Sequence, residues 1–204
     1  MVAIIDYGAG NLQSVKKAID FIGAESIITS NKSEILNASH VILPGVGSFG
    51  DAMNSMNSRG LTQTVKQAAL SGVPFFGICL GLQLLFESSE ESPGVDGLGI
   101  FKGKIVEIPR SGGLKVPHIG WNSLEITQKN GIFNGIANGS YVYFVHSYYL
   151  ESNDKSIVSA KTQYGIPIEC AVSSGSVFAT QFHPEKSSAV GLKILKNFLE
   201  AGNN

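Results

Sequence analysis

The stretch Pro74-Phe75-Phe76-Gly77-Ile78-Cys79-Leu80-Gly81-Leu82-Gln83 decides the fold. Its apolar first half predicts a buried strand, and Leu82, Leu85 and Phe86 follow at helical spacing. A cysteine between the two, with glycine two residues before and two residues after it, is typical of a nucleophile elbow. Glycine is favoured at both flanks because a sharp, strained turn brings backbone segments too close together for a Cβ atom.

On the N-terminal side of this stretch, short apolar runs alternate with helical patterns. The pattern predicts strands over 2–7, 26–29, 40–43 and 74–78. It predicts helices from Leu12 to a stop at Gly23, near Glu34, and over 61–70. Such alternation favours an α/β fold in which an open, largely parallel sheet carries helices on both faces.

The second half of the chain has a different texture, with strands separated by Gly, Asn, Ser and Asp. Strands are expected over 100–108, 123–127, 141–151, 157–164, 168–172 and 177–182. Much of this half should be antiparallel or mixed. Val190, Ile194 and Phe198 then form the apolar stripe of a final amphipathic helix. Without a repeat or linker, residues 1–204 are expected to form a single domain.

Composition excludes several function classes. The 15 Lys and Arg balance 16 Asp and Glu, so no long-range field recruits nucleic acid or a membrane surface. The uncharged run from Gln67 to Phe86 is interrupted by polar residues and glycines, which favours buried core over a membrane span. Two cysteines and an N-terminus that resembles a first strand favour a reducing, cytoplasmic location.

Cys79 is the candidate nucleophile. The N-terminus of the predicted helix favours the thiolate, because free N–H groups and the helix dipole stabilise negative charge there. The alternative is that Cys79 is a small buried apolar residue, the usual fate of a free cysteine. The elbow context favours the nucleophile, whereas Cys170 lies in an ordinary strand pattern and is expected to be structural.

Four histidines could act as general acid and base, and only His183 comes with a partner in place. In His183-Pro184-Glu185 the proline favours extended geometry, in which side chains two positions apart share a side. Glu185 can therefore orient the imidazole, which gives the triad Cys79, His183 and Glu185. His146 is the main rival but lacks a neighbouring carboxylate, and His40 and His118 are expected to be polar residues at strand ends. No two histidines have metal-ligand spacing.

The segment Gly45-Val46-Gly47-Ser48-Phe49-Gly50 fits the G-x-G-x-x-G pattern of dinucleotide sites. Such a site also needs an acid about 20 residues later, and none occurs between Asp51 and Glu87. A loop of this kind can instead point a backbone N–H at a developing oxyanion, together with the N–H of Leu80. The alternative is a tight turn whose glycines serve steric needs alone.

These motifs resemble the class I glutamine amidotransferases, whose signatures match Gly77-Ile78-Cys79-Leu80-Gly81-Leu82-Gln83 and His183-Pro184-Glu185. Within that family the chain most closely resembles the glutaminase subunits of imidazole glycerol phosphate synthases. The motifs for this closer resemblance are Ile5-Asp6-Tyr7-Gly8-Ala9-Gly10-Asn11, the block from Pro44 to Met53, Pro117-His118-Ile119-Gly120-Trp121-Asn122 and His183-Pro184-Glu185-Lys186-Ser187. They cover nearly the whole chain.

The resemblance implies a flavodoxin-like fold and a histidine-biosynthesis enzyme. In that enzyme this subunit makes ammonia, and a (β/α)₈ cyclase subunit, its partner in a heterodimer, consumes it. The cyclase turns a phosphorylated ribulosyl aminoimidazole nucleotide into imidazole glycerol phosphate and an aminoimidazole carboxamide ribotide. No metal or organic cofactor is implied.

The resemblance also implies roles for individual residues. Gly47 lies in the oxyanion strand beside Leu80. The glutamine pocket is lined by Gln83, Glu91, Ser147 and Tyr148, although Glu90 fills the place of Glu91 after a shift of one residue. The residues that approach the partner are Pro117, Trp121, Asn122, Tyr143 and Lys186. Taken alone, the single tryptophan fits a partly buried core position equally well, and Lys186 fits a solvated surface charge.

The expected activity is hydrolysis of glutamine to glutamate and ammonia through a thioester on Cys79. The alternatives are the glutaminase subunit of another synthase, a free-standing cysteine amidase or peptidase, and a catalytically silent scaffold.

Overall fold

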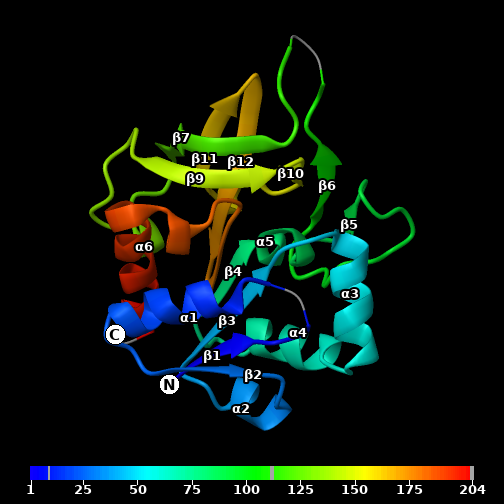
Figure 1. The fold of residues 1–204 in the computed structure, drawn as a ribbon, viewed down its shortest axis with the longest axis vertical. Coiled ribbons are helices and arrows are strands. Elements are labelled where there is room, and N and C mark those ends of the chain that lie inside the picture. Colours follow the sequence, from blue (N-terminus) through cyan, green and yellow to red (C-terminus); the bar gives the residue numbers. More distant parts are fainter. Residues whose placement is uncertain (9, 111–112, 203–204) are drawn as a thin grey trace.

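The computed structural model describes residues 1–8, 10–110 and 113–202, so Ala9 of the first motif lies outside the described residues. Parallel strands form one half of the main sheet (Figure 1). Their spatial order is β2 (Ser26–Thr29), β1 (Val2–Ile5), β3 (His40–Gly45), β4 (Phe75–Cys79) and β13 (Val177–Thr180). The predicted parallel sheet is confirmed.

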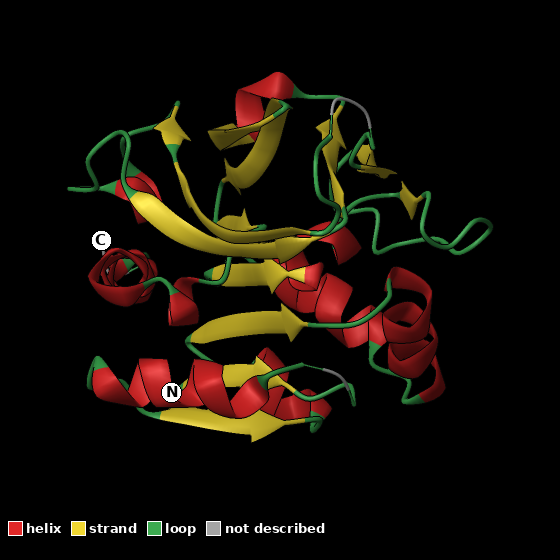
Figure 2. Cartoon of the chain, turned by 45° about the horizontal axis from the view of Figure 1, so that its top comes forward, coloured by secondary structure: helices red, strands yellow, loops and turns green. Residues whose placement is uncertain are grey.

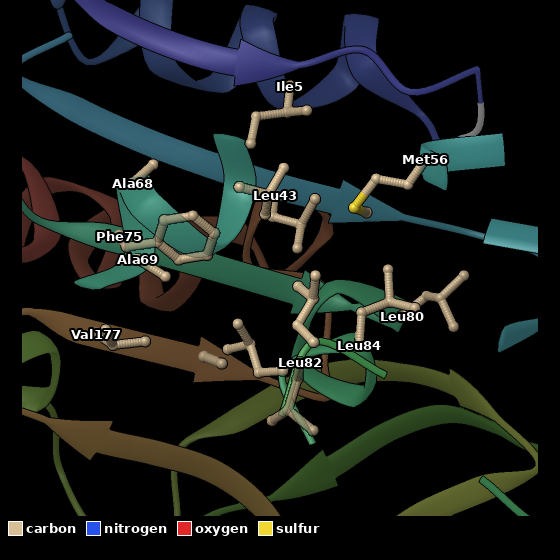
Figure 3. Close-up of a cluster of buried hydrophobic side chains, with 14 of the residues drawn as sticks. Ile5, Leu43, Met56, Ala68, Ala69, Phe75, Leu80, Leu82, Leu84 and Val177 are labelled. Atoms are coloured by element: carbon tan, nitrogen blue, oxygen red, sulfur yellow. The ribbon is translucent and has the colours of Figure 1, made fainter. Parts of the chain in front are cut away.

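Helices cover both faces of the parallel half, as predicted (Figure 2). One face packs against α1 (Leu12–Phe21) and α6 (Ser188–Glu200). The other face packs against α2 (Lys32–Leu36), α3 (Phe49–Ser58), α4 (Thr62–Leu70) and α5 (Leu80–Leu84). Figure 3 shows the second of these cores, where Leu43 of β3 and Phe75 of β4 lie among helix side chains. The core thus fixes the strands whose ends carry the site.

The main sheet continues beyond β13 with largely antiparallel strands. Next to β13 are β12 (Ile166–Ser174), β10 (Tyr148–Ser152), β6 (Gly103–Glu107) and β5 (Ser88–Ser89). Strand β11 (Val158–Tyr164) pairs with both β12 and β8 (Glu125–Ile126). Short 3₁₀ helices occur at Gly131–Phe133, Lys155–Ile157 and Pro184–Lys186. The strand-rich second half is therefore also confirmed.

A separate two-stranded sheet is formed by β7 (His118–Ser123) and β9 (Tyr141–His146). The prediction of one continuous strand over 141–151 is wrong here, because the chain passes from β9 to β10, in the main sheet, at Ser147. The residues of both strands have high β propensity and no turn residue separates them except Ser147, so the sequence hides the change of sheet. No strand was predicted over most of β7, although His118 was expected to lie at a strand end.

Helix α3 is another element that was not predicted from the sequence, because the glycines of 45–50 indicated a loop. The helix begins at Phe49, directly after Ser48, whose Oγ accepts a hydrogen bond of 3.2 Å from the N–H of Asp51. Serine is a favoured N-cap, so a start signal was present. Helix α5 is shorter than expected and ends at Leu84, before Leu85 and Phe86. Over the described part of the chain, no helix is long and apolar enough to cross a membrane.

Candidate active site

Cys79 lies on a strained turn between β4 and α5. Its φ is 56° and its ψ is −106°, a conformation that residues with a side chain rarely adopt. Strain of this kind persists only where the surroundings enforce it, and it concentrates at functional sites. Cys79 is 7% exposed and lies at the carboxyl edge of the parallel strands. The predicted elbow is therefore present.

The flanking glycines have the steric cause that the sequence indicates. A Cβ on Gly81 would lie 1.9 Å from the carbonyl oxygen of Leu43 in β3, and a Cβ on Gly77 would lie 2.8 Å from the carbonyl oxygen of Gly81. Both distances are far below van der Waals contact. The strained turn at Cys79 can thus form only if positions 77 and 81 carry no side chain.

His183 reaches Cys79 because β4 and β13 are neighbouring parallel strands, paired at Ile78 and Thr180. Cys79 is the last residue of β4, His183 lies three residues after the end of β13, and both line one cavity. The N–H of His183 donates a hydrogen bond of 3.0 Å to the carbonyl of Tyr143, which ties the histidine to β9.

Glu185 orients the His183 ring. His183 Nδ1 lies 2.8 Å from Glu185 Oε1, and the two side chains are only 2% and 1% exposed. Burial lowers the pKa of His183, but interactions with Cys79 and then with Glu185 outweigh it and raise this pKa to about 9. The Nε2 atom is buried and has no hydrogen-bond partner among the described residues. It is therefore free to exchange a proton with a bound substrate.

A cavity of about 370 Å³ opens over Cys79 and His183. It is lined by Val46, Gly47, Cys79, Leu80, Gln83, Glu91, Pro117, Val145, His146, Ser147, Tyr148, His183 and Lys186. Its volume falls in the range of small-molecule sites. The structure thus brings together all the residues expected to line the oxyanion and substrate sites.

Residues 3–201 match the family of the class-I glutamine amidotransferases. This chain belongs to that family. The sequence is 52% identical over 200 residues to imidazole glycerol phosphate synthase subunit HisH of Caldanaerobacter subterraneus, covering 98% of each chain. It is 50% identical over 198 residues to the protein of that name from Bacillus cereus, covering 97% of this chain and 93% of the relative.

Among solved structures, a crystal structure of a glutamine amidotransferase superposes with a TM-score of 0.76 and 20% identity, covering 98% of each chain. At that identity the likeness shows the fold alone. The fold of this amidotransferase is the one predicted from its sequence.

The glycine loop of this amidotransferase does not form a dinucleotide site. The first N–H groups of α3 are already occupied: Phe49 donates to Glu91 Oε2 at 2.8 Å, and Gly50 donates to Ser92 Oγ at 2.9 Å. A pyrophosphate would need those donors. Gly47 has a φ of 97° and open space where a Cβ would stand, so glycine is needed there for conformation and not for packing.

Glu90 and Glu91, the two candidates for the glutamine pocket, make different contacts. Glu91 lines the cavity while its Oε2 caps α3. Glu90 Oε2 instead accepts a hydrogen bond of 3.1 Å from the N–H of Glu107, and its Oε1 lies 3.7 Å from Lys104 Nζ. Of the two, Glu91 therefore lies in the wall of the cavity that also contains Cys79.

The remaining thiol and histidines have other surroundings. Cys170 is fully buried in β12, and burial raises the pKa of its thiol. His40 lies at the start of β3, and its Nε2 is 3.1 Å from the carbonyl oxygen of Ala201. His118 begins β7, as expected of a strand-end residue, but it is buried and its Nδ1 lies 3.0 Å from His146 Nε2. In the described ranges, no group of acidic, histidine and cysteine side chains is arranged to hold a metal ion.

The expected partner residues lie around the cavity mouth and on the outer face of the β7–β9 sheet. Pro117 and Lys186 line the cavity, and Trp121 is 50% exposed and packs edge-on against Tyr143, its register partner. Asn122 differs from the others, because its amide turns inward to His118 and to the carbonyl of Gln163.

Sequence reasoning missed Gln181. Its Nε2 lies 3.7 Å from the Cys79 sulfur, and the side chain is fully buried. A signal was present, since Gln181 stands two positions before His183 and extended residues at that spacing share a side.

Proposed function

We propose that this chain is the glutaminase subunit of an imidazole glycerol phosphate synthase. It hydrolyses glutamine to glutamate and ammonia and passes the ammonia to a (β/α)₈ cyclase subunit, with which it forms a heterodimer. Identities near 50% to relatives of that name, over nearly the whole of each chain, support the proposal. The observation that carries the chemistry is the strained cysteine sharing one cavity with a histidine that a buried glutamate orients. Residues 1–204 serve as one glutaminase domain.

In the first half-reaction the Cys79 thiolate attacks the carboxamide carbon of glutamine. The charge that develops on the carboxamide oxygen is held by the N–H of Leu80 and by the Gly47 region. The C–N bond then breaks as Nε2 of the His183 imidazolium gives its proton to the departing nitrogen. Ammonia and a γ-glutamyl thioester on Cys79 result. A pKa of about 9 keeps His183 protonated for this step at neutral pH.

In the second half-reaction water gives a proton to His183 Nε2 as it attacks the thioester carbon. The C–S bond breaks, the new γ-carboxyl group releases the second proton of the water to solvent to give glutamate, and the thiolate and imidazolium are restored. Glu185 holds Nδ1 throughout, so that Nε2 alone exchanges protons.

Glutamine binds in the cavity along Gln83, Glu91, Ser147 and Tyr148. Glu91 supplies a carboxylate for the α-ammonium group of the substrate, because it lines the cavity wall while its Oε2 remains fixed by Phe49. Charge pairing of this kind selects a free amino acid over an internal residue of a peptide.

The cyclase docks on the outer face of the β7–β9 sheet and at the cavity mouth. Exposed Ile119, Trp121 and Tyr141 form an apolar patch there. Aromatic side chains are enriched among the residues that dominate binding energy at protein interfaces. Pro117, Tyr143 and Lys186 complete the surface, with the Asn122 amide turned inward behind it. Ammonia crosses this surface before bulk water can protonate it.

The proposal is tested by measuring glutamate release by the chain alone, with a histidine-pathway cyclase barrel, and with that barrel carrying its nucleotide substrate. Activity should be weak alone and rise steeply with the loaded barrel. Equal rates in all three samples would instead indicate a free-standing amidase, and activation by a different ammonia acceptor would indicate another synthase. A γ-diazoketone analogue of glutamine should label Cys79, as mapped by mass spectrometry. A silent scaffold would leave that cysteine unlabelled.

A further inference from the structure

A buried chain of hydrogen bonds connects strand β7 with the sulfur of Cys79. At one end, Gln181 Nε2 lies 3.7 Å from Cys79 Sγ, and Gln181 Oε1 accepts a hydrogen bond of 3.1 Å from Gln83 Nε2. Gln83 Nε2 also donates, at 3.2 Å, to the carbonyl oxygen of Tyr148. Gln181 is fully buried and Gln83 is 5% exposed. The amide that faces the sulfur is therefore held from behind by a second amide.

The chain continues through two imidazoles. His146 Nδ1 lies 2.9 Å from the same Tyr148 carbonyl oxygen, and His146 Nε2 lies 3.0 Å from His118 Nδ1. Asn122 Nδ2 lies 3.4 Å from His118 Nε2. The His118 ring is stacked against Tyr164, with centroids 3.9 Å apart, and against Phe144 at 4.8 Å. Both rings are thus fixed in position as well as hydrogen-bonded.

One arrangement of protons satisfies every contact in this chain. The Asn122 amide can only donate through Nδ2, so His118 accepts at Nε2 and carries its proton on Nδ1. That proton goes to His146 Nε2, which leaves the proton of His146 on Nδ1, facing the Tyr148 carbonyl. Donors therefore point in one direction, from Asn122 to the carbonyl that Gln83 also contacts.

Neither imidazole adds charge to the site at neutral pH. Burial lowers the pKa of His118 to about 4. Burial, together with repulsion from His118 and His183, lowers the pKa of His146 to about 3. The other titratable groups near Cys79 are His183 with Glu185 behind it, Tyr7, and Tyr148, Glu91 and Lys186 on the cavity wall. Only the Gln181 amide provides a neutral side-chain donor to the sulfur among these described neighbours.

We propose that Gln181 is a positioning residue that fixes and stabilises the Cys79 thiolate, and that Gln83, His146 and His118 hold it in place. The inference rests on the proposed role of Cys79 as the nucleophile. An N–H that points at sulfur favours the charged form and limits the directions in which the sulfur can move. The neutral imidazoles keep this support rigid without competing with His183 for the proton.

The test follows alkylation of Cys79 by iodoacetamide across pH in the full chain, with the modified peptide quantified by mass spectrometry. Gln181→Met keeps the length of the side chain and removes the donor. The midpoint of alkylation should rise by about one pH unit, which corresponds to the loss of a hydrogen bond to a charged group. His118→Phe keeps the stacked ring and removes both nitrogens, and it should produce a smaller rise.

Asn197→Leu is the matched control. Asn197 is another buried amide, in α6, where it donates to the carbonyls of Ile132 and Asn134 away from the cavity. In Asn197→Leu the pH midpoint of Cys79 alkylation should equal that of the wild type. A midpoint for Gln181→Met that also equals the wild type, or a rise as large in Asn197→Leu, would overturn the proposal.

A second measurement needs no variant that could misfold. In the isotope-labelled wild type, the side-chain amide signals of Gln181 should move with the same midpoint as Cys79 alkylation, and signals that stay fixed would also overturn the proposal. Neither measurement uses glutamine or a partner. If the wild-type protein had no glutaminase activity but Gln181→Met still shifted the midpoint of Cys79 alkylation, the result would therefore contradict only the proposed function.

Discussion

Gly45 and Cys79 are register partners at the carboxyl ends of the parallel strands β3 and β4. The loop that follows Gly45 therefore begins directly beside Cys79. A Cβ on Gly45 would lie 2.6 Å from the Tyr7 hydroxyl and 2.8 Å from Leu80 Cβ. The close approach of β3 to the elbow thus depends on a missing side chain, as the elbow itself does.

Gly81→Ala should unfold or severely destabilise the chain, by more than about 3 kcal/mol, because its Cβ meets a backbone carbonyl of β3 that cannot move away. Gly175→Ala is the comparison, since it has a φ of 57° and open space around it. It should cost about 1 kcal/mol from backbone strain alone. Urea denaturation of both variants measures this, and equal costs would contradict the steric account of the elbow.

Cys79→Gly should be more stable than Cys79→Ala by about 1 kcal/mol. Both variants lack the sulfur, so neither retains the nucleophile. Only glycine relieves the strain of a φ of 56°. Thermal unfolding followed by circular dichroism should give the glycine variant the higher melting temperature. An alanine variant of equal or greater stability would show that the turn stores little strain.

The pKa of His183 should fall in Cys79→Ala, and by a smaller amount in Glu185→Gln, because Cys79 is the larger of the two causes that raise it. Imidazole C–H signals in NMR spectra should titrate near pH 9 in the wild type. The folded-state pKa lies above the ordinary value of 6.5, so the protonated ring stabilises the fold below about pH 6.5. That stabilisation should be lost as the pH rises from 6.5 through about 9. A wild-type midpoint near 6.5 would rule out the ion pair.

The free energy of unfolding of Tyr7→Phe should equal that of the wild type or exceed it by up to about 1 kcal/mol. The hydroxyl is buried without a hydrogen-bond partner among the described residues, and burial followed by proximity to Cys79 raises the pKa of this tyrosine. Removing an unsatisfied buried group removes its desolvation cost. Denaturant unfolding checks the result, and a loss of stability would reveal a partner for the hydroxyl.

Trp121→Ala should weaken binding to the cyclase at least tenfold and change stability little, because half of the side chain is exposed. Phe21→Ala is the matched control: this aromatic residue is 78% exposed at the end of α1, away from the β7–β9 sheet. Calorimetric titration with the barrel subunit measures both variants. Equal affinities of the two variants for the barrel subunit would show that the cyclase does not dock on this face.

The elbow could be predicted from sequence because its signal is local: a strand, a turn and glycines within five positions. The same holds for His183 and Glu185, whose pairing needs only two residues of extended chain. The shift from β9 to β10 at Ser147 could not be predicted, since alternation fixes which side chains share a face and not which strand lies opposite. For that reason the contact of His118 with His146, across β7 and β9, also escaped sequence reasoning.

Helix α3 was missed for a different reason. Glycines before it matched a loop pattern and outweighed the cap at Ser48 and the buried Met53 and Met56 at helical spacing. Gln181 was visible inside the histidine motif, but its contact with sulfur depends on how β13 and β4 pair.

That pairing also has a consequence for biosynthesis of the chain. Strands β4 and β13 are neighbours in space, yet His183 leaves the ribosome more than 100 residues after Cys79. A nascent polypeptide therefore carries its reactive sulfur for several seconds, at ordinary translation speeds, without a base beside it. Under the proposed mechanism, glutaminase activity therefore arises only after β13 has joined the sheet and brought His183 to Cys79.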